Sequence, residues 1–195
     1  MNFQEEKALL RAQALKVRDA MPSDVRIEKS LIAAEHGRAN ITFEPGTVIS
    51  GFFPIRSEID PRPLMDGLGK SGARLCLPVV ADKTTIVFRE LLPGADLVDT
   101  GFGTRGPGPD SEILDPELLI MPLSVFDHLG GRIGYGAGHY DRAIAKIIGK
   151  GIKPTLVGMA FDCQCVEKVP VEPHDQPLDA MLTDSGYHPA RKAPE

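Results

Sequence analysis

A glycine-rich segment at residues 130–142 lies between an apolar run and a segment with the apolar spacing of a helix. Five glycines occur within its first nine residues, and glycine accepts the positive φ angles that other residues avoid. Such a segment, followed by a helix, gathers unpaired backbone N–H groups and the positive end of the helix dipole, and both attract an anion. The pattern therefore predicts a strand–loop–helix unit whose loop binds phosphate.

This loop matches neither of the two common nucleotide-binding patterns. Residues 130–142 contain no Gly-Lys pair followed by Ser or Thr, which a Walker loop requires. Counted from Gly134, the sixth position of a dinucleotide-binding fingerprint is His139, where Gly or Ala is required. Arginine, tyrosine and aspartate side chains alternate with the glycines, and they favour a ligand-binding loop. The alternative is a tight turn that only joins a strand to a helix.

The composition indicates one globular domain. With 195 residues, 42% of them hydrophobic and 25% charged, the chain is long enough for one substantial core. The net charge of −5 gives no overall attraction to nucleic acid or to an acidic membrane, and no apolar run approaches the roughly 18 residues that span a bilayer. The N-terminus lacks the apolar core of a signal peptide. We expect a cytoplasmic protein without nucleic-acid or membrane partners, acting as a monomer or weak homodimer.

The three cysteines form an odd and sparse set. Cys163 and Cys165 are too close together to form half of an ordinary zinc site, and no second pair of ligands accompanies them. We therefore expect these two residues and Cys76 to be free thiols in a reducing compartment.

Apolar spacing along the chain predicts helices that alternate with strands. The expected helices cover residues 3–20, 23–37, 61–68 and the segment after the glycine loop. The expected strands cover residues 47–53, 74–80, 84–89, 118–121 and 155–161, with a hairpin at 81–83. This alternation indicates an α/β fold with a largely parallel sheet and helices on both faces. Ligands of such sheets bind beyond the carboxyl ends of the strands, where the glycine loop falls.

Finer expectations concern side-chain faces and one loop. Ser23 is expected to cap the second helix. The apolar side of that helix should comprise Val25, Ile27, Leu31 and Ile32. In the helix after the glycine loop, the apolar face should comprise Ile144, Ile147 and Ile148. Residues 101–109 are rich in glycine and proline, so they should lack regular structure and form a loop across the surface or over the site.

The run Gly-Arg-Ile-Gly-Tyr-Gly-Ala-Gly-His-Tyr-Asp-Arg at 131–142 resembles the signature of the 5-formyltetrahydrofolate cyclo-ligase (5,10-methenyltetrahydrofolate synthetase) family. The resemblance covers nearly the whole chain in the family's order. The other matching parts are Lys7 and Arg11, the turn 53–60, the Leu-Pro strand end at 75–78, the run 118–127, and the tail segments 170–175 and 178–184. It implies one cyclo-ligase domain over residues 1–195, with a three-layer fold similar to sugar-phosphate isomerases and CoA-transferases. The loop departs from the family at His139, where tyrosine often stands.

The resemblance implies an ATP-dependent ligase. ATP phosphorylates the formyl oxygen of 5-formyltetrahydrofolate, the folate N10 attacks the activated carbon, and phosphate leaves to give 5,10-methenyltetrahydrofolate. Phosphoryl transfer needs mainly positioning and charge stabilisation, so a cationic cradle with Mg²⁺ suffices. ATP and Mg²⁺ are therefore the expected cofactors.

The resemblance also assigns roles to individual residues. Arg132 and Tyr140 are expected to be catalytic. The expected ATP-binding residues are Lys7, Arg11, Arg132, Ile133, Gly134, Tyr135, Gly136, Ala137, Gly138, His139 and Tyr140. The expected folate-binding residues are Phe53, Glu58 and Tyr140; Glu58 grips the pterin, and Tyr140 either stacks on the folate or hydrogen-bonds near the formyl group. Asp141 and Asp175 resemble metal carboxylates, and Mg²⁺ takes one or two carboxylates beside phosphate oxygens and water.

Each assignment has a structural alternative. The two basic positions of the first helix could form a solvated face, since Arg18 continues their stripe. Glu58 could favour a helix start through the dipole, Asp141 could cap or charge the helix that starts there, and Asp175 could be a surface residue. Two other functions remain open: a sugar-phosphate isomerase-like or CoA-transferase-like enzyme that needs no ATP, and a regulatory paralogue that binds folate or nucleotide without turnover.

Overall fold

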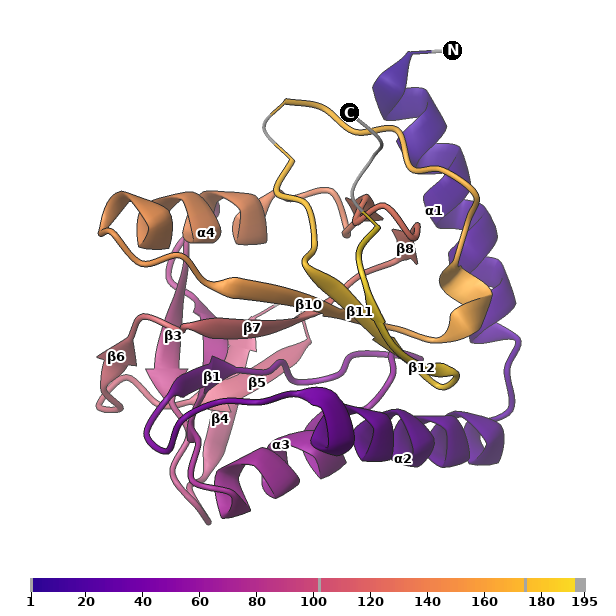
Figure 1. Cartoon of the computed structure of the whole chain (residues 1–195). Helices are drawn as coiled ribbons and strands as arrows, with labels where there is room; N and C mark the ends of the chain where they lie inside the picture. Colours follow the sequence, from indigo (N-terminus) through magenta and orange to yellow (C-terminus); the bar gives the residue numbers. More distant parts are fainter. Residues whose placement is uncertain (1, 102, 174, 192–195) are drawn as a thin grey trace.

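A computed structural model describes residues 2–101, 103–173 and 175–191 (Figure 1). Its main sheet contains, in spatial order, β12 (Gly186–Pro189), β11 (Ala180–Thr183), β10 (Thr155–Met159), β7 (Leu118–Pro122), β1 (Val48–Ser50), β2 (Arg74–Val80), β3 (Ile86–Glu90) and β6 (Ile113–Leu114). The neighbours from β11 to β2 run parallel, whereas β12, β3 and β6 are antiparallel additions at the two edges. The largely parallel sheet confirms the expected α/β class.

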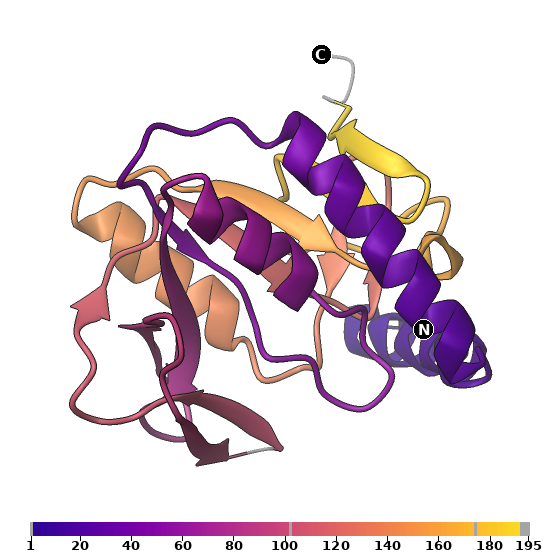
Figure 2. The same cartoon turned by 90° about the horizontal axis from the view of Figure 1, so that it is seen from below.

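Helices cover both faces of this sheet. Helices α2 (Ser23–Asn40) and α3 (Arg62–Lys70) pack together on one face, and α4 (His139–Gly149) covers the other (Figures 1 and 2). Helix α1 (Phe3–Asp19) stands beyond the end of the sheet toward which β10 points (Figure 1). The molecule therefore has the predicted three layers, and α1 closes the edge at which ligands of parallel sheets bind.

Helix α1 begins with a reciprocal cap. The Asn2 side chain accepts a hydrogen bond from the Glu5 backbone N–H at 2.8 Å, and the Glu5 carboxylate accepts one from the Asn2 N–H at 2.9 Å. Lys7, Ala14 and Arg18 are the buried residues of this helix. Because these positions are seven and four residues apart, which is about two turns and one turn of the helix, they share one face, and that face is turned into the molecule.

Helix α2 packs through small residues rather than through its large apolar ones. Its buried positions are Ser30, Ala33, Ala34 and Gly37. A Cβ at Gly37 would lie 2.7 Å from Leu64 Cδ1, so the helix approaches α3 closely only because this position is glycine. The predicted apolar face was therefore wrong: close packing selects the small side chains, while Val25 is only half-buried and Ile27, Leu31 and Ile32 are exposed.

Two other helix expectations need correction. Ser23 is the first residue of α2, Pro22 holds the capping position, and no side chain caps the helix. In α4, Ile144 and Ile147 are buried with Ala143, but Ile148 is 46% exposed. At 100° per residue, the buried sector is centred between Ala143 and Ile144, which leaves Ile148 at its edge.

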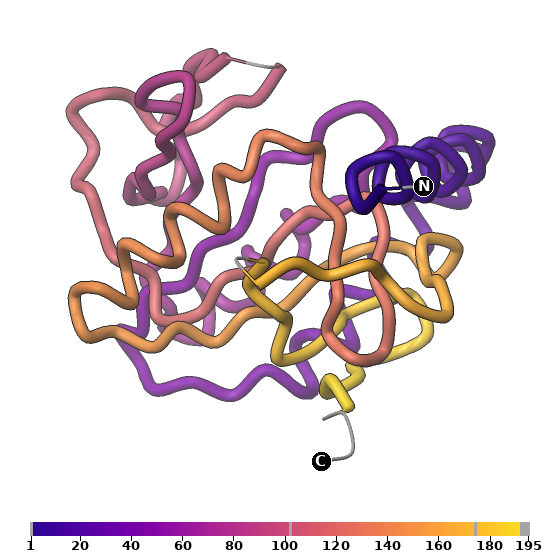
Figure 3. The backbone as a smooth tube through the Cα atoms, turned by 90° about the horizontal axis from the view of Figure 1, so that it is seen from above, coloured from indigo at the N-terminus to yellow at the C-terminus, as the bar shows by residue number. Residues whose placement is uncertain are grey.

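Residues 101–109 are not irregular as predicted. The strands β4 (Leu97–Gly101) and β5 (Thr104–Pro107) form an antiparallel hairpin that projects from one corner of the molecule (Figures 2 and 3). Gly101 and Gly103 have φ angles of 88° and 78°, which a tight turn between strands requires. Glycine thus forms the turn and does not prevent pairing. Phe102 lies outside the described residues.

The expected strands occur in the right order, and the strand predicted at 74–80 has the predicted bounds. The strand predicted at 47–53 ends at Ser50, and the one predicted at 155–161 ends at Met159. Cys76, Cys163 and Cys165 are free thiols, as predicted. No helix within the described residues has the length and apolar character needed to cross a membrane.

Candidate active site

A cavity of about 860 Å³ lies beyond the carboxyl ends of β1, β2 and β7. Its walls come from α1, the loop after β1, the glycine loop with the start of α4, and residues 172–176. Every residue that the sequence predicted for the site lines it: Lys7, Arg11, Phe53, Glu58, Arg132, Ile133, Gly134, Tyr135, Gly136, Ala137, Gly138, His139, Tyr140, Asp141 and Asp175. The fold thus brings together residues that lie up to 168 positions apart.

The start of the glycine loop is held by a buried carboxylate. The short strands β8 (Val125–Phe126) and β9 (Arg132–Ile133) pair on either side of a turn. Inside that turn, Asp127 accepts hydrogen bonds from the backbone N–H groups of Leu129, Gly131 and Val169 at 2.7–2.9 Å. A Cβ at Gly131 would lie 2.7 Å from the Asp127 carboxylate, so glycine is required here.

The second half of the loop leads into α4. Gly136 and Gly138 have φ angles of 97° and 64°, and Gly138 is the residue that precedes the helix. Arg142 donates to the carbonyl of Ala137 at 2.6 Å and to that of Thr84 at 2.8 Å, which ties the loop to the β2–β3 hairpin. The loop therefore places the N-terminal turn of α4, where the helix dipole favours an anion, at the wall of the cavity.

Basic side chains of α1 reach the cavity opposite this loop. Lys7 Nζ lies 2.6 Å from Asp175 and 2.8 Å from Glu172, and Arg11 Nε donates to the Gly134 carbonyl at 2.8 Å. Burial lowers the pKa of Lys7, but the bonds to the two carboxylates outweigh it and leave that pKa raised. Lys7 is 8% exposed, which contradicts the alternative of a solvated helix face.

Arg132 and Asp141 form a second ion pair in the cavity wall. Their atoms Nη2 and Oδ1 lie 2.6 Å apart, and Asp141 Oδ1 also accepts from the Gln176 N–H at 3.2 Å. These partners contradict a capping role, because α4 has no side-chain cap. The buried Nε of Arg132 has no hydrogen-bond partner among the described residues. A donor that is buried without a partner is unusual, and it suits a site that binds an anion.

Glu58 lies in the cavity as a buried carboxylate. Its Oε1 accepts from the Tyr135 hydroxyl at 2.6 Å and its Oε2 from the Ile55 N–H at 2.8 Å. Burial raises the pKa of Glu58, although both hydrogen bonds act in the opposite direction. Helix α3 begins only at Arg62. Glu58 is therefore held by these two hydrogen bonds and not by the dipole of a helix N-terminus.

Tyr140 presents a second unusual donor. Its hydroxyl is buried and has no hydrogen-bond partner in the part of the chain that the structure describes. Burial is the main cause that raises its pKa. The hydroxyl therefore stays protonated at neutral pH and is available as a hydrogen-bond donor.

The carboxylates predicted to hold a metal already neutralise basic side chains. Asp141 pairs with Arg132 and Asp175 with Lys7. Among the described residues, no group of three or more His, Cys, Asp or Glu side chains is arranged to hold a metal ion. Asp141 and Asp175 thus provide carboxylate oxygens without a complete coordination shell. His174 lies outside the described residues.

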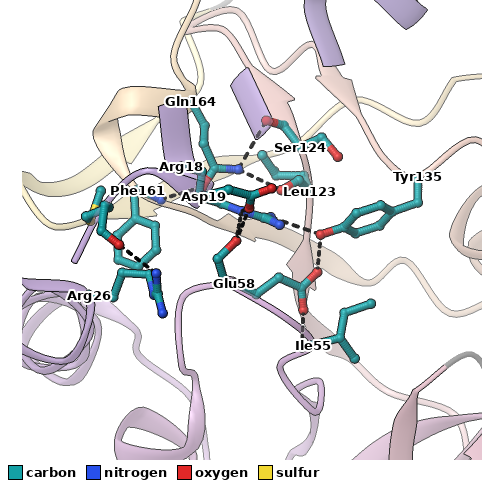
Figure 4. A network of polar contacts seen from close by, with 12 residues as sticks. Arg18, Asp19, Arg26, Ile55, Glu58, Leu123, Ser124, Tyr135, Phe161 and Gln164 are labelled. Carbon is teal, nitrogen blue, oxygen red and sulfur yellow. Dashed lines mark hydrogen bonds and ion pairs between the residues drawn. The ribbon is translucent and has the colours of Figure 1, made fainter. Parts of the chain in front are cut away.

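Sequence reasoning missed several residues of the site. Gln4 and Glu172 line the cavity beside Lys7, and Gln4 donates to Glu172 at 3.0 Å. Arg18 is 1% exposed and contacts Tyr135 and Ser57 (Figure 4). A signal existed for Arg18, because it lies seven residues after Arg11 and hence on the same helix face.

Known proteins resemble this chain in both sequence and fold. The family model described as the 5-formyltetrahydrofolate cyclo-ligase family matches residues 3–184. The 5-formyltetrahydrofolate cyclo-ligase of Escherichia coli is 36% identical over 143 residues, covering 70% of this chain and 78% of the relative. That of Haemophilus influenzae is 28% identical and covers 93% of this chain and 99% of the relative.

Solved structures agree with these matches. The 5,10-methenyltetrahydrofolate synthetase of Aquifex aeolicus is 27% identical, with a TM-score of 0.75 over 97% of this chain and 95% of that one. The synthetase of Mycoplasma pneumoniae is 21% identical, with a TM-score of 0.73 over 91% and 98%, and it shows the shared fold. The match over residues 3–184, together with the cavity that gathers the signature residues, shows that the chain belongs to the 5-formyltetrahydrofolate cyclo-ligase family.

Proposed function

We propose that this protein uses ATP to convert 5-formyltetrahydrofolate to 5,10-methenyltetrahydrofolate, with release of ADP and phosphate. The observation that carries the proposal is one cavity containing a glycine loop, basic side chains and the buried carboxylate of Glu58. Family membership supports the same reaction, since the relatives are named for it.

In this proposal the ATP phosphates bind between the glycine loop and α1. Arg132 Nε, which has no partner among the described residues, can donate to a phosphate oxygen, and the dipole of α4 favours negative charge at the start of that helix. Lys7 and Arg11 neutralise charge from the opposite wall. Lys7 has three N–H donors, so it can keep one carboxylate partner and still bind a phosphate.

The folate binds toward Glu58. Phe53 provides an apolar surface for the pterin, and the Glu58 carboxylate accepts hydrogen bonds from its aminopyrimidine edge. Tyr140 donates a hydrogen bond near the formyl oxygen that becomes phosphorylated. We prefer this role to stacking because the Tyr140 hydroxyl is a buried donor without a partner among the described residues.

We assign Mg²⁺ to Asp141 and Asp175. Both are carboxylates at the phosphate end of the cavity, and Mg²⁺ binds through one or two carboxylates, phosphate oxygens and water, which does not require a preformed cage. Held there, a divalent cation would help to neutralise charge on the transferred phosphoryl group. Arg132 and Lys7 would then exchange their ion pairs with Asp141 and Asp175 for contacts to the nucleotide.

The test is the appearance of the methenyl chromophore. Purified protein mixed with 5-formyltetrahydrofolate, ATP and Mg²⁺ should produce it, and omission of ATP should abolish it. Excess EDTA should stop the reaction and added Mg²⁺ should restore it. Absence of product in the complete mixture would refute the proposed reaction, whereas full activity in EDTA would remove only the metal role of the two aspartates.

We further propose that the active unit is one domain over residues 1–195, a monomer or weak homodimer in the cytoplasm. The family model spans residues 3–184, which supports one domain. Sedimentation of the purified protein across a range of concentrations tests the oligomeric state.

A further inference from the structure

Arg18 is a buried cation that has no place in the reaction as proposed so far. It is 1% exposed, and it donates from Nη1 to the Tyr135 hydroxyl at 2.9 Å and from Nε to Ser57 Oγ at 3.0 Å (Figure 4). Among the residues that the structure describes, its one ion pair is with Asp19, at 3.7 Å, and the Asp19 side chain is 57% exposed. A buried charge is expensive to maintain, so its contacts call for an explanation.

The chemistry of the guanidinium fixes the direction of two hydrogen bonds. Arginine has N–H donors and no acceptor, so the oxygens of Tyr135 and Ser57 must accept from Arg18. Each hydroxyl proton is then directed elsewhere: Tyr135 donates to Glu58 Oε1 at 2.6 Å, and Ser57 donates to the Asp19 carboxylate. Arg18 therefore determines that the Tyr135 hydroxyl faces Glu58 as a donor.

These contacts leave the Glu58 carboxylate able to accept two parallel hydrogen bonds from one ligand. An ionised carboxylate has about four acceptor positions, two on each oxygen. Tyr135 occupies one position on Oε1, and the Ile55 N–H occupies one on Oε2 at 2.8 Å. One position on each oxygen remains for two parallel N–H groups, the arrangement that an aminopyrimidine edge offers.

We propose that Arg18 and Tyr135 are positioning residues that orient Glu58 for the folate and make folate affinity depend on the state of the glycine loop. The assignment rests on the proposed folate site at Glu58. Tyr135 belongs to the loop that is proposed to bind phosphate, so a nucleotide that orders the loop also holds the tyrosine hydroxyl against the carboxylate. By linkage, each ligand then strengthens the binding of the other by the same factor.

The test compares binding of 5-formyltetrahydrofolate to the wild-type protein and to Tyr135→Phe by calorimetry, with and without a non-hydrolysable ATP analogue and Mg²⁺. Tyr135→Phe removes only the hydroxyl, and we expect the folate Kd to rise about tenfold, as for a lost hydrogen bond to a charged group. We expect the Kd of the analogue alone to change less than the folate Kd does, because the substitution keeps the ring and the loop backbone. The analogue should strengthen folate binding in wild type and lose that effect in the variant.

Two further variants separate positioning from folding. Tyr187→Phe is the matched control, since Tyr187 is half-buried in β12 and does not line the cavity. Arg18→Lys keeps the charge, and it should weaken folate binding less than Arg18→Met does. If the melting temperature falls with Arg18→Met, Tyr135→Phe still decides the question, because it leaves Arg18 in place.

The outcomes separate this inference from the proposed function. If wild type binds folate and Tyr135→Phe binds it equally tightly, the positioning role is wrong and the proposed reaction stands. If the nucleotide analogue leaves the folate Kd of wild type unchanged, the dependence of folate affinity on the loop is refuted. If wild type binds no folate, the proposed function falls and this inference falls with it.

Discussion

At the scale of single residues, the cavity is built from compensated charges. Lys7 pairs with Asp175 and Glu172, and Arg132 pairs with Asp141. Glu58 accepts a hydrogen bond from Tyr135, whose hydroxyl in turn accepts one from Arg18. Buried charges persist in proteins when they are paired or hydrogen-bonded. If a nucleotide and its cation bind as proposed, they exchange partners with these groups and leave no isolated charge behind.

Substitution of Arg132 should distinguish nucleotide binding at one end of the cavity from folate binding at the other. We expect Arg132→Ala to raise the Kd of an ATP analogue about tenfold or more and to change the folate Kd little, because the lost donors serve the phosphate end. Glu58→Ala should show the opposite pattern. Calorimetric titration with each ligand measures both constants. Arg38→Ala in α2 removes an exposed arginine outside the cavity and should alter neither.

The raised pKa of Glu58 should appear in the pH dependence of stability. Burial raises this pKa in the folded chain above its value of 4.5 in the unfolded chain, so unfolding releases a proton between the two values. The contribution of Glu58 to the free energy of unfolding is therefore complete below pH 4.5 and declines as the pH rises through the folded pKa.

Urea titrations from pH 4 to pH 8 test this dependence. Glu58→Gln cannot titrate, so its free energy of unfolding, measured relative to wild type, should increase over the same interval and then level off. A difference between the two proteins that stays constant across the range would contradict the raised pKa.

At the scale of elements, small residues decide how helices approach the sheet. Helix α2 buries Ser30 as well as its alanines, and Ser30 Oγ accepts a hydrogen bond from the Asp60 N–H at 3.0 Å. That contact anchors the end of the loop that carries Glu58. Close packing of α2 thus helps to place a site residue that lies in another element.

Gly37→Ala should therefore destabilise the protein. The added Cβ would lie 2.7 Å from Leu64 Cδ1 and 2.9 Å from Leu182 Cδ2, and overpacking of this kind costs about 1–3 kcal/mol. Gly149→Ala is the matched control at the end of α4, because nothing lies within 4 Å of its added Cβ and alanine favours a helix. Chemical denaturation should show a lower midpoint for the first variant only, and equal midpoints would contradict the packing argument.

At the scale of the whole molecule, the site exists only because distant segments meet. Helix α1 closes the carboxyl end of the sheet and contributes Lys7 and Arg11 to the cavity, while α2 and α3 cover a face away from it (Figures 1 and 2). Ligand binding should therefore stabilise α1 against local opening more than α2.

Hydrogen exchange should detect this difference between the helices. We expect an ATP analogue with Mg²⁺ to slow amide exchange in residues 3–19 clearly and in residues 23–40 little, since of these two helices α1 lines the cavity and α2 does not. Mass spectrometry of the two sets of peptides compares them within one sample. Equal protection of both helices would indicate a global effect and contradict binding between α1 and the glycine loop.

Local chemistry explains which parts the sequence alone determined. The glycines of residues 130–142 have no Cβ, so the strand–loop–helix unit could be predicted from composition and order. The alternation of helices with apolar strands likewise predicted the α/β class and the placement of the loop at the carboxyl ends of the strands. The resemblance to the family then supplied residues such as Glu58, for which no local pattern exists.

Only the tertiary structure decided which faces are buried and how the charges pair. The large apolar residues of α2 point outward because the sheet and α3 admit only small side chains, and the hairpin 97–107 forms because β2 lies beside it. The roles of Arg18 and Glu172 depend on partners more than 100 residues away. Packing and long-range pairing are properties of the assembled chain, so residue order by itself could not determine them.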